Sequence, residues 1–457
     1  MDEQEKKYIE MTQPPVERLI CKLAVPCIIS MLVTSFYNMA DTFFVGQLKS
    51  NAATGAVGVV FSMMAIIQAV GFFFGQGSGT YISRALGQKE YDKAGQMAAT
   101  GFFSALAIGT VICVLGQIFL EPLAYLLGST DTILVHTKAY LRAILFGAPF
   151  MVASFVLNNQ LRFQGGAFYA MVGITTGAVL NIILDPILIF GCNLGVAGAG
   201  WATSISQGVS FILLLLGCSR GSNIRIQLRN FRLKWAYYHM IIRGGLPSLA
   251  RQCLASLATI SLNHAIAAVL TGAQADAAIA AMGVVQRIAM FFASTMLGFG
   301  QGFQPVCGFN YGAGLYDRVK RGFWFCVKIS AAALVVIGGL GFIFADGLIG
   351  LFRDDPDVIR YGALALRLQC ATLPTHSWIV MSNMLQQSTN RTASATFLSV
   401  ARQGLFFIPC VLILSATVGI LGVQMAQSCA DLLTLACAIP IQGYVLKTMG
   451  TEKILKK

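Results

Sequence analysis

The feature that most constrains this chain is a series of apolar runs, each roughly 20 residues long, that recurs along almost its whole length. Twelve such runs are present, and several contain Gly or Pro, which membrane helices tolerate. An apolar run of this length crosses the hydrocarbon core of a bilayer as a helix. The sequence therefore predicts an all-α polytopic membrane protein with twelve transmembrane helices. The runs begin near Leu19, Ala53, Lys93, Thr132, Ala167, Gly195, Met240, Ala275, Arg318, Asp357, Arg391 and Gly419.

Composition excludes the soluble alternatives. Only 11% of the 457 residues are charged, whereas a soluble domain carries about 25%. The net charge of +13 is compatible with a nucleic-acid binder, but 56% hydrophobic residues are not. We therefore expect a lipid partner and no nucleic acid. The four histidines, at 136, 239, 264 and 376, have no metal-ligand spacing, so we expect no metal and no cofactor.

The basic residues are unevenly divided between the two sets of loops. Twelve spans place both termini on one side, and that side carries most of the Lys and Arg residues. By the positive-inside rule, both termini are predicted to lie in the cytoplasm. Residues 1–15 are polar and lack the pattern of a signal peptide, so the first apolar run is expected to remain in the mature protein. The opposite loops hold only Lys49, Lys138, Arg353 and Arg360.

The chain is internally duplicated. A shift of 225 residues aligns FGQG at 74–77 with FGQG at 299–302, YDK at 91–93 with YDR at 316–318, and Pro149 with Pro374. Because each copy has an even number of spans, the two copies have the same orientation, as in transporters whose halves rock about a central site. We predict two pseudo-symmetric six-helix lobes: an N-terminal tail (1–18), an N-lobe (19–219), a basic linker (220–239) that could also bind anionic lipid, a C-lobe (240–446) and a C-terminal tail (447–457).

Three acids, Asp41, Asp185 and Asp431, lie inside predicted spans. A carboxylate inside the membrane is costly, so each is a candidate functional residue. Tyr37 and Asp41 are four residues apart and share a helix face, as do Asn181 and Asp185.

Burial favours the neutral form of a carboxyl group, which makes Asp41 and Asp185 candidate sites for a proton or a sodium ion. The alternative is that each acid pairs with a polar neighbour and only fixes helix packing. The repeat aligns Asp41 with positions 262–263 and Asp185 with position 408, where the second half has no acid. Ion coupling is therefore predicted in the N-lobe. Asp431 aligns with Gln207, and a pore contact and a structural pair both remain open for it.

Other intramembrane residues are less specific. The methionines Met39, Met63, Met64, Met171, Met282, Met290 and Met296 could provide an adaptable cavity surface, although most methionines in apolar helices only pack. Six cations lie inside predicted spans, where they either reach an interface or line a cavity: Arg142, Arg251, Arg287, Lys328, Arg367 and Arg402.

The glycine-rich string at 75–79 resembles a phosphate loop, but it follows no strand and is better explained by close helix contact.

Five strings together resemble the multidrug and toxic compound extrusion (MATE) transporters, in particular their MepA-like and DinF-like bacterial branch. They are LAVPCIISMLVTSFYNMADTFFVGQL, GQGSGTYISRALGQKEYDKA, LNNQLRFQGGAFYAM, LNIILDPILIFGCNLGVAGAGWAT and GFGQGFQPVCGFNYGAGLYDR. The resemblance extends over residues 14–445. It implies a MATE fold with a V-shaped cavity, and export of organic cations in exchange for protons or sodium across the bacterial inner membrane, by a protein expected to be a monomer.

The resemblance also implies site residues. Asp41, Asn181 and Asp185, with Tyr37, Asn158 and Thr203, correspond to the cation-coupling cluster of the N-lobe. Spans seven and ten lack the acids that one branch of the family uses, and offer Asn263, His264, Asn383 and Gln386 instead. We count Met39, Met64, Met171, Met282, Met290, Asn263, Asn383 and Gln386 as candidate residues of the substrate cavity.

Three rival functions remain open. A lipid-linked precursor flippase of the same superfamily would place Arg142, Arg251 and Arg367 in the cavity. A membrane-embedded transferase would need paired metal-binding acids, for which only Asp354, Asp355 and Asp357 are available, in an outer loop where acids commonly cap a helix. A passive channel is disfavoured by the two-lobe repeat. We expect a secondary-active exporter and no enzyme.

Overall fold

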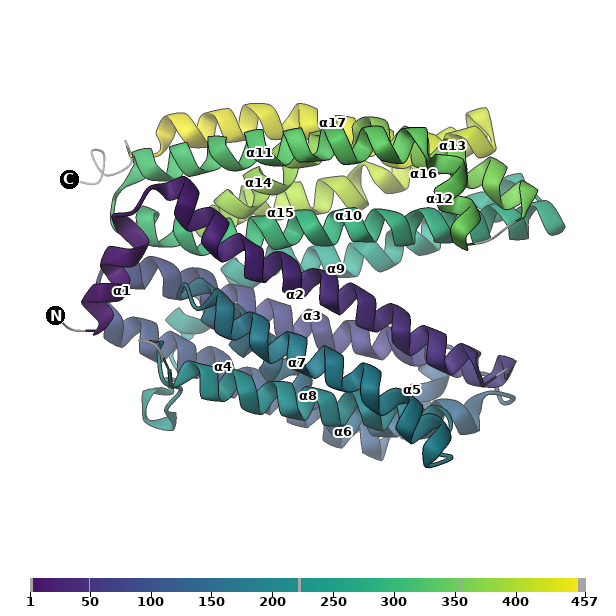
Figure 1. Ribbon diagram of the computed structural model, residues 1–457, viewed down its shortest axis with the longest axis horizontal. Helices are drawn as coiled ribbons and strands as arrows, with labels where there is room; N and C mark the ends of the chain where they lie inside the picture. The colour runs from purple at the N-terminus through teal and green to yellow at the C-terminus, as the bar shows by residue number, and fades with distance from the viewer. Residues whose placement is uncertain (1–2, 49, 221–222, 353–354, 451–457) are drawn as a thin grey trace.

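The computed structural model describes residues 3–48, 50–220, 223–352 and 355–450, which form helices and connecting turns without any strand (Figure 1). The all-α prediction is thus confirmed for the described chain. The first half contains α1 (Glu3–Thr12), α2 (Val16–Gly46), α3 (Asn51–Gly87), α4 (Tyr91–Ile118), α5 (Leu120–Leu126), α6 (Leu134–Phe163), α7 (Ala167–Pro186) with the π-helical turn η1 (Ile187–Gly191), and α8 (Val196–Cys218). A linker containing the short turn η2 (Leu228–Asn230) follows.

The second half contains a corresponding series of six spans. It comprises α9 (Trp235–Val269), α10 (Ala273–Gly312), α11 (Tyr316–Ile343), α12 (Ala345–Phe352), α13 (Pro356–Thr372), α14 (Thr375–Ser388), α15 (Thr392–Val400) with the π-helical turn η3 (Ala401–Leu405), α16 (Phe407–Val418) and α17 (Ile420–Thr448). Both halves therefore have a π-helical segment in their fifth span, where the regular hydrogen-bond ladder of the helix is interrupted.

Eleven helices of the described chain are long and apolar enough to cross a membrane. The tenth predicted span is absent from this set because it is broken into α13 and α14, which have 17 and 14 residues. The break falls at Leu373 and Pro374, and proline has no backbone N–H to continue a helix. The tenth span is thus a pair of shorter helices and not one continuous helix, and it brings the number of spans to the predicted twelve.

The helix boundaries confirm the internal duplication. α3 ends at Gly87 and α10 at Gly312, while α4 begins at Tyr91 and α11 at Tyr316. Both pairs keep the offset that aligned the two halves of the sequence. The duplication therefore extends from residue types to the lengths of the elements, as a pseudo-symmetric two-lobe fold requires.

The ends of the predicted segments differ from the structure by a few residues. α2 begins at Val16 and not at Leu19, and α9 begins at Trp235 and not at Met240. The N-terminal tail is largely helical, because it forms α1. Asp355, one of the acids of the outer loop, caps α13 by accepting hydrogen bonds from the backbone N–H groups of Asp357 and Val358. Lys49, Arg353, Asp354 and the tail beyond residue 450 lie outside the described residues.

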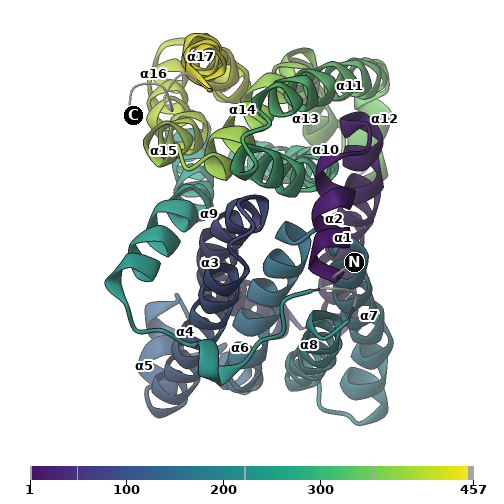
Figure 2. The ribbon, with the colours of Figure 1, turned by 90° about the vertical axis from the view of Figure 1, so that its left-hand side faces the viewer.

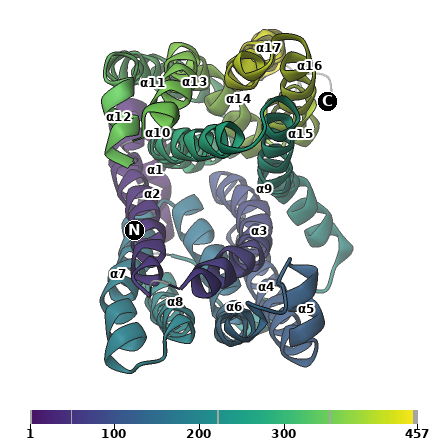
Figure 3. The same cartoon turned by 90° about the vertical axis from the view of Figure 1, so that its right-hand side faces the viewer.

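The two lobes lie side by side, and α2 and α9 lie at opposite sides of the boundary between them (Figure 2). On one flank α2 packs against both α7 of its own lobe and α10 of the other. On the opposite flank α9 packs against α15 of its own lobe and α3 of the other. Figure 3 shows the same arrangement from the opposite end. The first helix of each lobe thus connects it to its partner lobe, and the two connections are pseudo-symmetric.

Glycines allow these inter-lobe helices to approach closely. A Cβ added at Gly87 of α3 would lie 2.2 Å from the carbonyl oxygen of Phe309 in α10, and one added at Gly312 of α10 would lie 2.2 Å from that of Arg84 in α3. The two contacts are related by the repeat. A Cβ added at Gly77, in the glycine-rich string, would likewise clash with the backbone carbonyl group of Ile241 in α9. The string is therefore a helix-contact motif, as expected from its sequence.

Helix α1 covers the face of the molecule that carries both termini, called here the terminal face (Figure 1). Lys89, in the turn after α3, forms an ion pair with Glu5 of α1 at 3.0 Å, and this hydrogen bond raises the pKa of Lys89. Asn310 of α10 donates from Nδ2 to the carbonyl oxygen of Met11 over 3.1 Å. One short helix therefore contacts both lobes at the terminal face.

Candidate cation-coupling site

The N-lobe encloses a cavity of about 260 Å³ that faces the C-lobe. Side chains of α2, α3, α6, α7 and α8 form most of its wall, and α9 and α10 of the C-lobe complete it. Tyr37, Asn158, Asn181 and Thr203, all predicted from sequence, line this cavity. Packing of α2 against α7 brings residues more than 100 positions apart to one end of it.

Asp41 lies on α2 and is 9% exposed. Tyr140 of α6 donates from Oη to Asp41 Oδ2 over 3.5 Å, and the same hydroxyl lies 3.9 Å from the sulfur of Met64. The other carboxylate oxygen of Asp41 is buried and has no hydrogen-bond partner among the described residues. Asp41 therefore has only one long hydrogen bond, and one of its oxygens remains open to a proton or a cation.

Asp185 lies at the end of α7 and is completely buried. Asn181, one turn earlier, has its Nδ2 3.5 Å from Asp185 Oδ1 and 3.3 Å from the Thr203 hydroxyl of α8. Asp185 Oδ2 and Asn181 Oδ1 have no hydrogen-bond partner in the described chain. Asp41 and Asp185 are close enough to interact electrostatically. We call Tyr37, Asp41, Tyr140, Asn181, Asp185 and Thr203 the N-lobe acid cluster.

The environment of these two acids is unusual for buried carboxylates. Buried charges are normally paired and fully hydrogen-bonded, because desolvation is expensive. No basic side chain of the described residues forms an ion pair with either acid. Three unpaired oxygens, on Asp41, Asn181 and Asp185, thus occur in one cluster. This arrangement can accept protons or a small cation, and it is poorly suited to a purely structural role.

Asn158 lies in the same cavity but has a different partner. Its Nδ2 donates to the carbonyl oxygen of Ala170 over 3.2 Å, which ties α6 to α7. Asn383, its equivalent in the repeat, donates in the same way to the carbonyl oxygen of Ala395 over 2.7 Å. This pair of bonds repeats in both lobes, whereas the acid cluster does not.

The candidate cavity residues are divided between several places. Met64 lines the N-lobe cavity, Met282 lines a second cavity in the C-lobe, and Met290 borders both. Met39 is 38% exposed and Met171 partly buried, and neither borders these two cavities.

The polar residues proposed for the C-lobe also lie outside both cavities. Asn263 is exposed. Gln386 is buried and donates from Nε2 to Gln442 Oε1 over 2.9 Å, and Asn383 additionally donates to the Ser399 hydroxyl over 2.9 Å.

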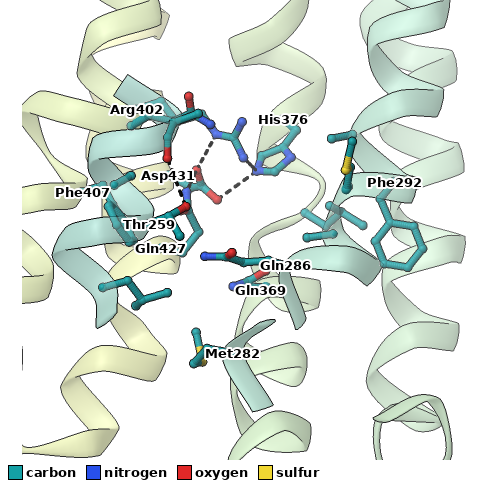
Figure 4. A pocket seen from close by; sticks show the side chains of 18 of the residues that line it. Thr259, Met282, Gln286, Phe292, Gln369, His376, Arg402, Phe407, Gln427 and Asp431 are labelled. Atoms are coloured by element: carbon teal, nitrogen blue, oxygen red, sulfur yellow. Dashed lines mark hydrogen bonds and ion pairs between the residues drawn. The ribbon is translucent and has the colours of Figure 1, made fainter. Parts of the chain in front are cut away.

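The C-lobe cavity, of about 290 Å³, contains a cluster that sequence reasoning did not assemble (Figure 4). Asp431 Oδ1 accepts from Arg402 Nε at 2.8 Å and from Gln427 Nε2 at 3.0 Å, and Asp431 Oδ2 lies 2.9 Å from His376 Nε2. His376 lies in the first turn of α14, just after the break that separates it from α13, and Arg402 lies in η3. We call His376, Arg402, Gln427 and Asp431 the C-lobe cluster.

Sequence reasoning also missed Tyr140. It is the only side chain of the described residues that donates a hydrogen bond to Asp41, and it is completely buried. A tyrosine in an apolar span is common and gives no periodic signal. The one available clue was its position in the same lobe as both acids.

Comparisons with known proteins agree with this fold. A sequence profile described as MatE matches residues 26–187 and 250–413, one segment in each lobe. The multidrug export protein MepA of Staphylococcus aureus strain MSSA476 is 26% identical over 464 residues, covering 100% of both chains. A crystal structure of MATE in complex with MaL6 has a TM-score of 0.91 at 24% identity, covering 98% of this chain and 99% of that one.

A further solved structure is described as the outward-facing conformation of a multidrug resistance MATE family transporter of the MOP superfamily. It has a TM-score of 0.90 at 24% identity, covering 97% of this chain and 98% of that one. The profile matches more than half of the chain, and one of its two segments lies in each lobe. The chain therefore belongs to the MATE family of membrane transporters, which are not enzymes.

Proposed function

We propose that the protein is a multidrug exporter that exchanges organic cations for protons, with sodium as the alternative coupling ion. The observation that carries the proposal is the N-lobe acid cluster, in which Tyr37, Asn181 and Thr203 line a cavity between the lobes. The two buried aspartates of the cluster lie beside these residues and have no basic partner among the described residues. The relative from Staphylococcus aureus named as a multidrug export protein supports the export function.

The proposed cycle depends on competition at the acid cluster. An organic cation is attracted by the ionised carboxylates of Asp41 and Asp185 from the adjoining cavity. Protonation of either acid from the outer side removes that attraction and releases the substrate. Tight packing at the terminal face, through Gly87 and Gly312, favours a cavity open away from that face. With both termini in the cytoplasm of a bacterial cell, this direction corresponds to export.

The test is ethidium transport into energised inverted membrane vesicles. Asp41→Asn and Asp185→Asn keep the size of the side chains and remove the ionisable group, so each is expected to lower transport at least tenfold. Asp276→Asn, which changes an exposed acid at the start of α10, is the matched control and should transport normally. Normal transport with unchanged pH dependence in both cluster variants would overturn the assignment.

One observation bears on the flippase alternative. Of the three cations that it required in the cavity, only Arg251 borders the N-lobe cavity. Arg142 is exposed, and Arg367 pairs with Asp346 at the surface, at 2.6 Å. A cavity that adjoins two unpaired acids and has one arginine in its wall favours cationic substrates over pyrophosphate.

A further inference from the structure

We propose that the C-lobe cavity is a second ligand-binding site, which accepts the carboxylate of an amphipathic molecule at Arg402. Binding there goes beyond the proposed exchange of cations at the N-lobe and does not depend on it. The proposal rests on the geometry of the C-lobe cluster, on the charge balance around the cavity and on the repeat.

The cavity has the layout of a site for an amphipathic ligand. One end is formed by the C-lobe cluster (Figure 4). The amide side chains of Gln286 and Gln369 border the space beside it. The remaining wall is largely apolar and includes Met282, Phe292 and Phe407. A pocket with an apolar wall and a few convergent polar groups is typical of small-molecule sites.

Neither carboxylate oxygen of the cluster is free to bind a cation. Both oxygens of Asp431 already lie within hydrogen-bond distance of donors on Arg402, Gln427 and His376, and its side chain is only 2% exposed. A cationic ligand would therefore find the carboxylate covered. This differs from the N-lobe acid cluster, where carboxylate oxygens are unpaired.

The cluster does have free donors. Arg402 uses Nε for Asp431 and Nη2 for His376, and its Nη1 makes no hydrogen bond within the described residues. Its side chain is 23% exposed and borders the cavity. A guanidinium presents five N–H groups in a planar fork that matches a carboxylate. Arg402 can therefore hold Asp431 and still offer N–H groups to a ligand.

Two contacts of His376 compete for the same ring nitrogen, and an anionic ligand would remove the competition. His376 Nε2 lies 2.9 Å from Asp431 Oδ2 and 3.0 Å from Arg402 Nη2. A single ring nitrogen either donates to the carboxylate or accepts from the guanidinium, but it cannot do both. If a ligand carboxylate accepts from Arg402 Nη2, His376 is free to donate to Asp431. Ligand binding then removes the conflict at His376 Nε2 and leaves both oxygens of Asp431 with donors.

The charge balance points in the same direction. Asp431 compensates Arg402, but a second guanidinium, that of Arg251, is close enough to interact with Arg402 electrostatically. With a neutral His376, this part of the molecule therefore has an excess of one positive charge. Isolated charges inside a membrane protein are costly and usually mark a ligand or ion path. A carboxylate neutralises the excess, whereas an amine would increase it.

The repeat shows that the two cavities occupy equivalent places in their lobes. His376, Gln427 and Asp431 of the C-lobe cavity align with Met151, Thr203 and Gln207, all of which line the N-lobe cavity. The duplicated fold thus provides the same cavity twice, with ionised groups placed differently. The unpaired acids of the N-lobe lie beside its cavity and not in its lining, whereas the lining of the C-lobe cavity includes an arginine with unused donors.

The test measures binding of 4-phenylbutyrate and of its methyl ester to the full-length protein in lipid nanodiscs by calorimetry, with empty nanodiscs subtracted. The two probes share an apolar body and differ in the carboxylate. The acid is expected to bind at least tenfold more tightly than the ester, since a charge-assisted hydrogen-bond pair contributes roughly a tenfold or larger factor. Equal binding of both probes, or binding of neither, would overturn the proposal.

The double variant Arg402→Gln/Asp431→Asn removes the guanidinium without leaving an unpaired buried acid. Its acid-to-ester preference is expected to fall below threefold, with ester affinity unchanged. Arg287→Gln is the matched control, because it removes an exposed arginine of α10 that lines neither cavity, and it should keep the preference. Loss of the preference in Arg287→Gln alone would contradict the assignment to Arg402.

Should the double variant fail to fold, Arg402→Lys decides the question. It keeps the positive charge and removes the planar fork, so acid affinity is expected to fall about fivefold while the ester is unaffected. An unchanged acid affinity in this variant would overturn the proposal. Because no gradient is imposed, a failure of these measurements leaves the export proposal intact, and a failure of export leaves them interpretable.

Discussion

At the scale of single residues, the three intramembrane aspartates differ in how completely their oxygens are paired. Asp41 and Asp185 each keep one buried oxygen without a partner in the described chain, while both oxygens of Asp431 contact donors. Unpaired buried polar atoms are expensive and persist mainly where function requires them. We therefore assign the first two acids to the proposed site for a proton or cation, and the third belongs to an ion pair.

Tyr140→Phe tests the hydroxyl that sequence reasoning missed. The change removes the hydrogen bond to Asp41 and keeps the aromatic ring. Because a single hydrogen bond contributes about 0.5–1.5 kcal/mol net, ethidium transport is expected to fall roughly two- to tenfold, less than in Asp41→Asn. Tyr125→Phe, at an exposed tyrosine, is the control. A Tyr140→Phe protein as inactive as Asp41→Asn would mean that the hydroxyl itself takes part in coupling.

Asp431→Asn tests the ion pair of the C-lobe. Removing one partner of a buried pair leaves the other uncompensated and costs about 3–5 kcal/mol. We expect Asp431→Asn to lower thermal stability clearly, and the double variant Arg402→Gln/Asp431→Asn to recover much of the loss. Thermal unfolding in detergent measures both. Equal stability of the single variant and the wild type would contradict the pairing.

The sequence was informative about these residues to different degrees. Asp41 and Asp185 could be predicted because an acid in an apolar span is rare and needs no partner to be noticed. The C-lobe cluster could not be predicted, since His376, Arg402 and Asp431 come from three separate elements. No spacing or periodicity relates them. Only the packing of α14, η3 and α17 brings them together.

At the scale of helices, small residues decide where the two lobes meet. Gly87 and Gly312 place α3 and α10 in contact at the terminal face. The sequence predicted a helix-contact role for the string at 75–79, because glycines in apolar spans allow close packing. It did not predict the break between α13 and α14, because Pro374 alone does not distinguish a kinked helix from two helices.

Gly312→Ala tests this contact. The new methyl group would lie 2.2 Å from the carbonyl oxygen of Arg84, so the helices must separate. Overpacking of this kind costs about 1–3 kcal/mol, and we expect lower thermal stability and reduced ethidium transport. Gly283→Ala, in the same helix but with nothing within 4 Å, should behave like the wild type. If the two substitutions had similar effects, the loss would come from alanine in α10 in general and not from the inter-lobe contact.

At the scale of the whole molecule, one duplicated unit provides two cavities with different chemistry. The helix boundaries repeat between the lobes, as do the bonds of Asn158 and Asn383. The charged groups do not repeat. The helical framework is thus repeated in the two lobes, while the residues that we propose to bind ions or ligands differ between them.

The proposed assignment of coupling to the N-lobe is the central claim of this account. It predicts that a gradient acts through Asp41 and Asp185, and that the C-lobe cluster has no part in coupling. The claim depends on two aspartates beside the N-lobe cavity that have unpaired oxygens, whereas the aspartate of the C-lobe cavity is paired with Arg402. The most direct test is therefore a transport measurement in which the ion gradient is changed while the substrate stays the same.

That measurement is ethidium flux in proteoliposomes with a pH gradient or a sodium gradient imposed separately. In the wild type, the pH gradient is expected to accelerate flux, and Asp41→Asn/Asp185→Asn should abolish the acceleration while Arg402→Gln/Asp431→Asn retains it. If the pH and sodium gradients both leave wild-type flux unchanged, or if the N-lobe double variant responds like the wild type, the coupling site lies elsewhere and the account is wrong.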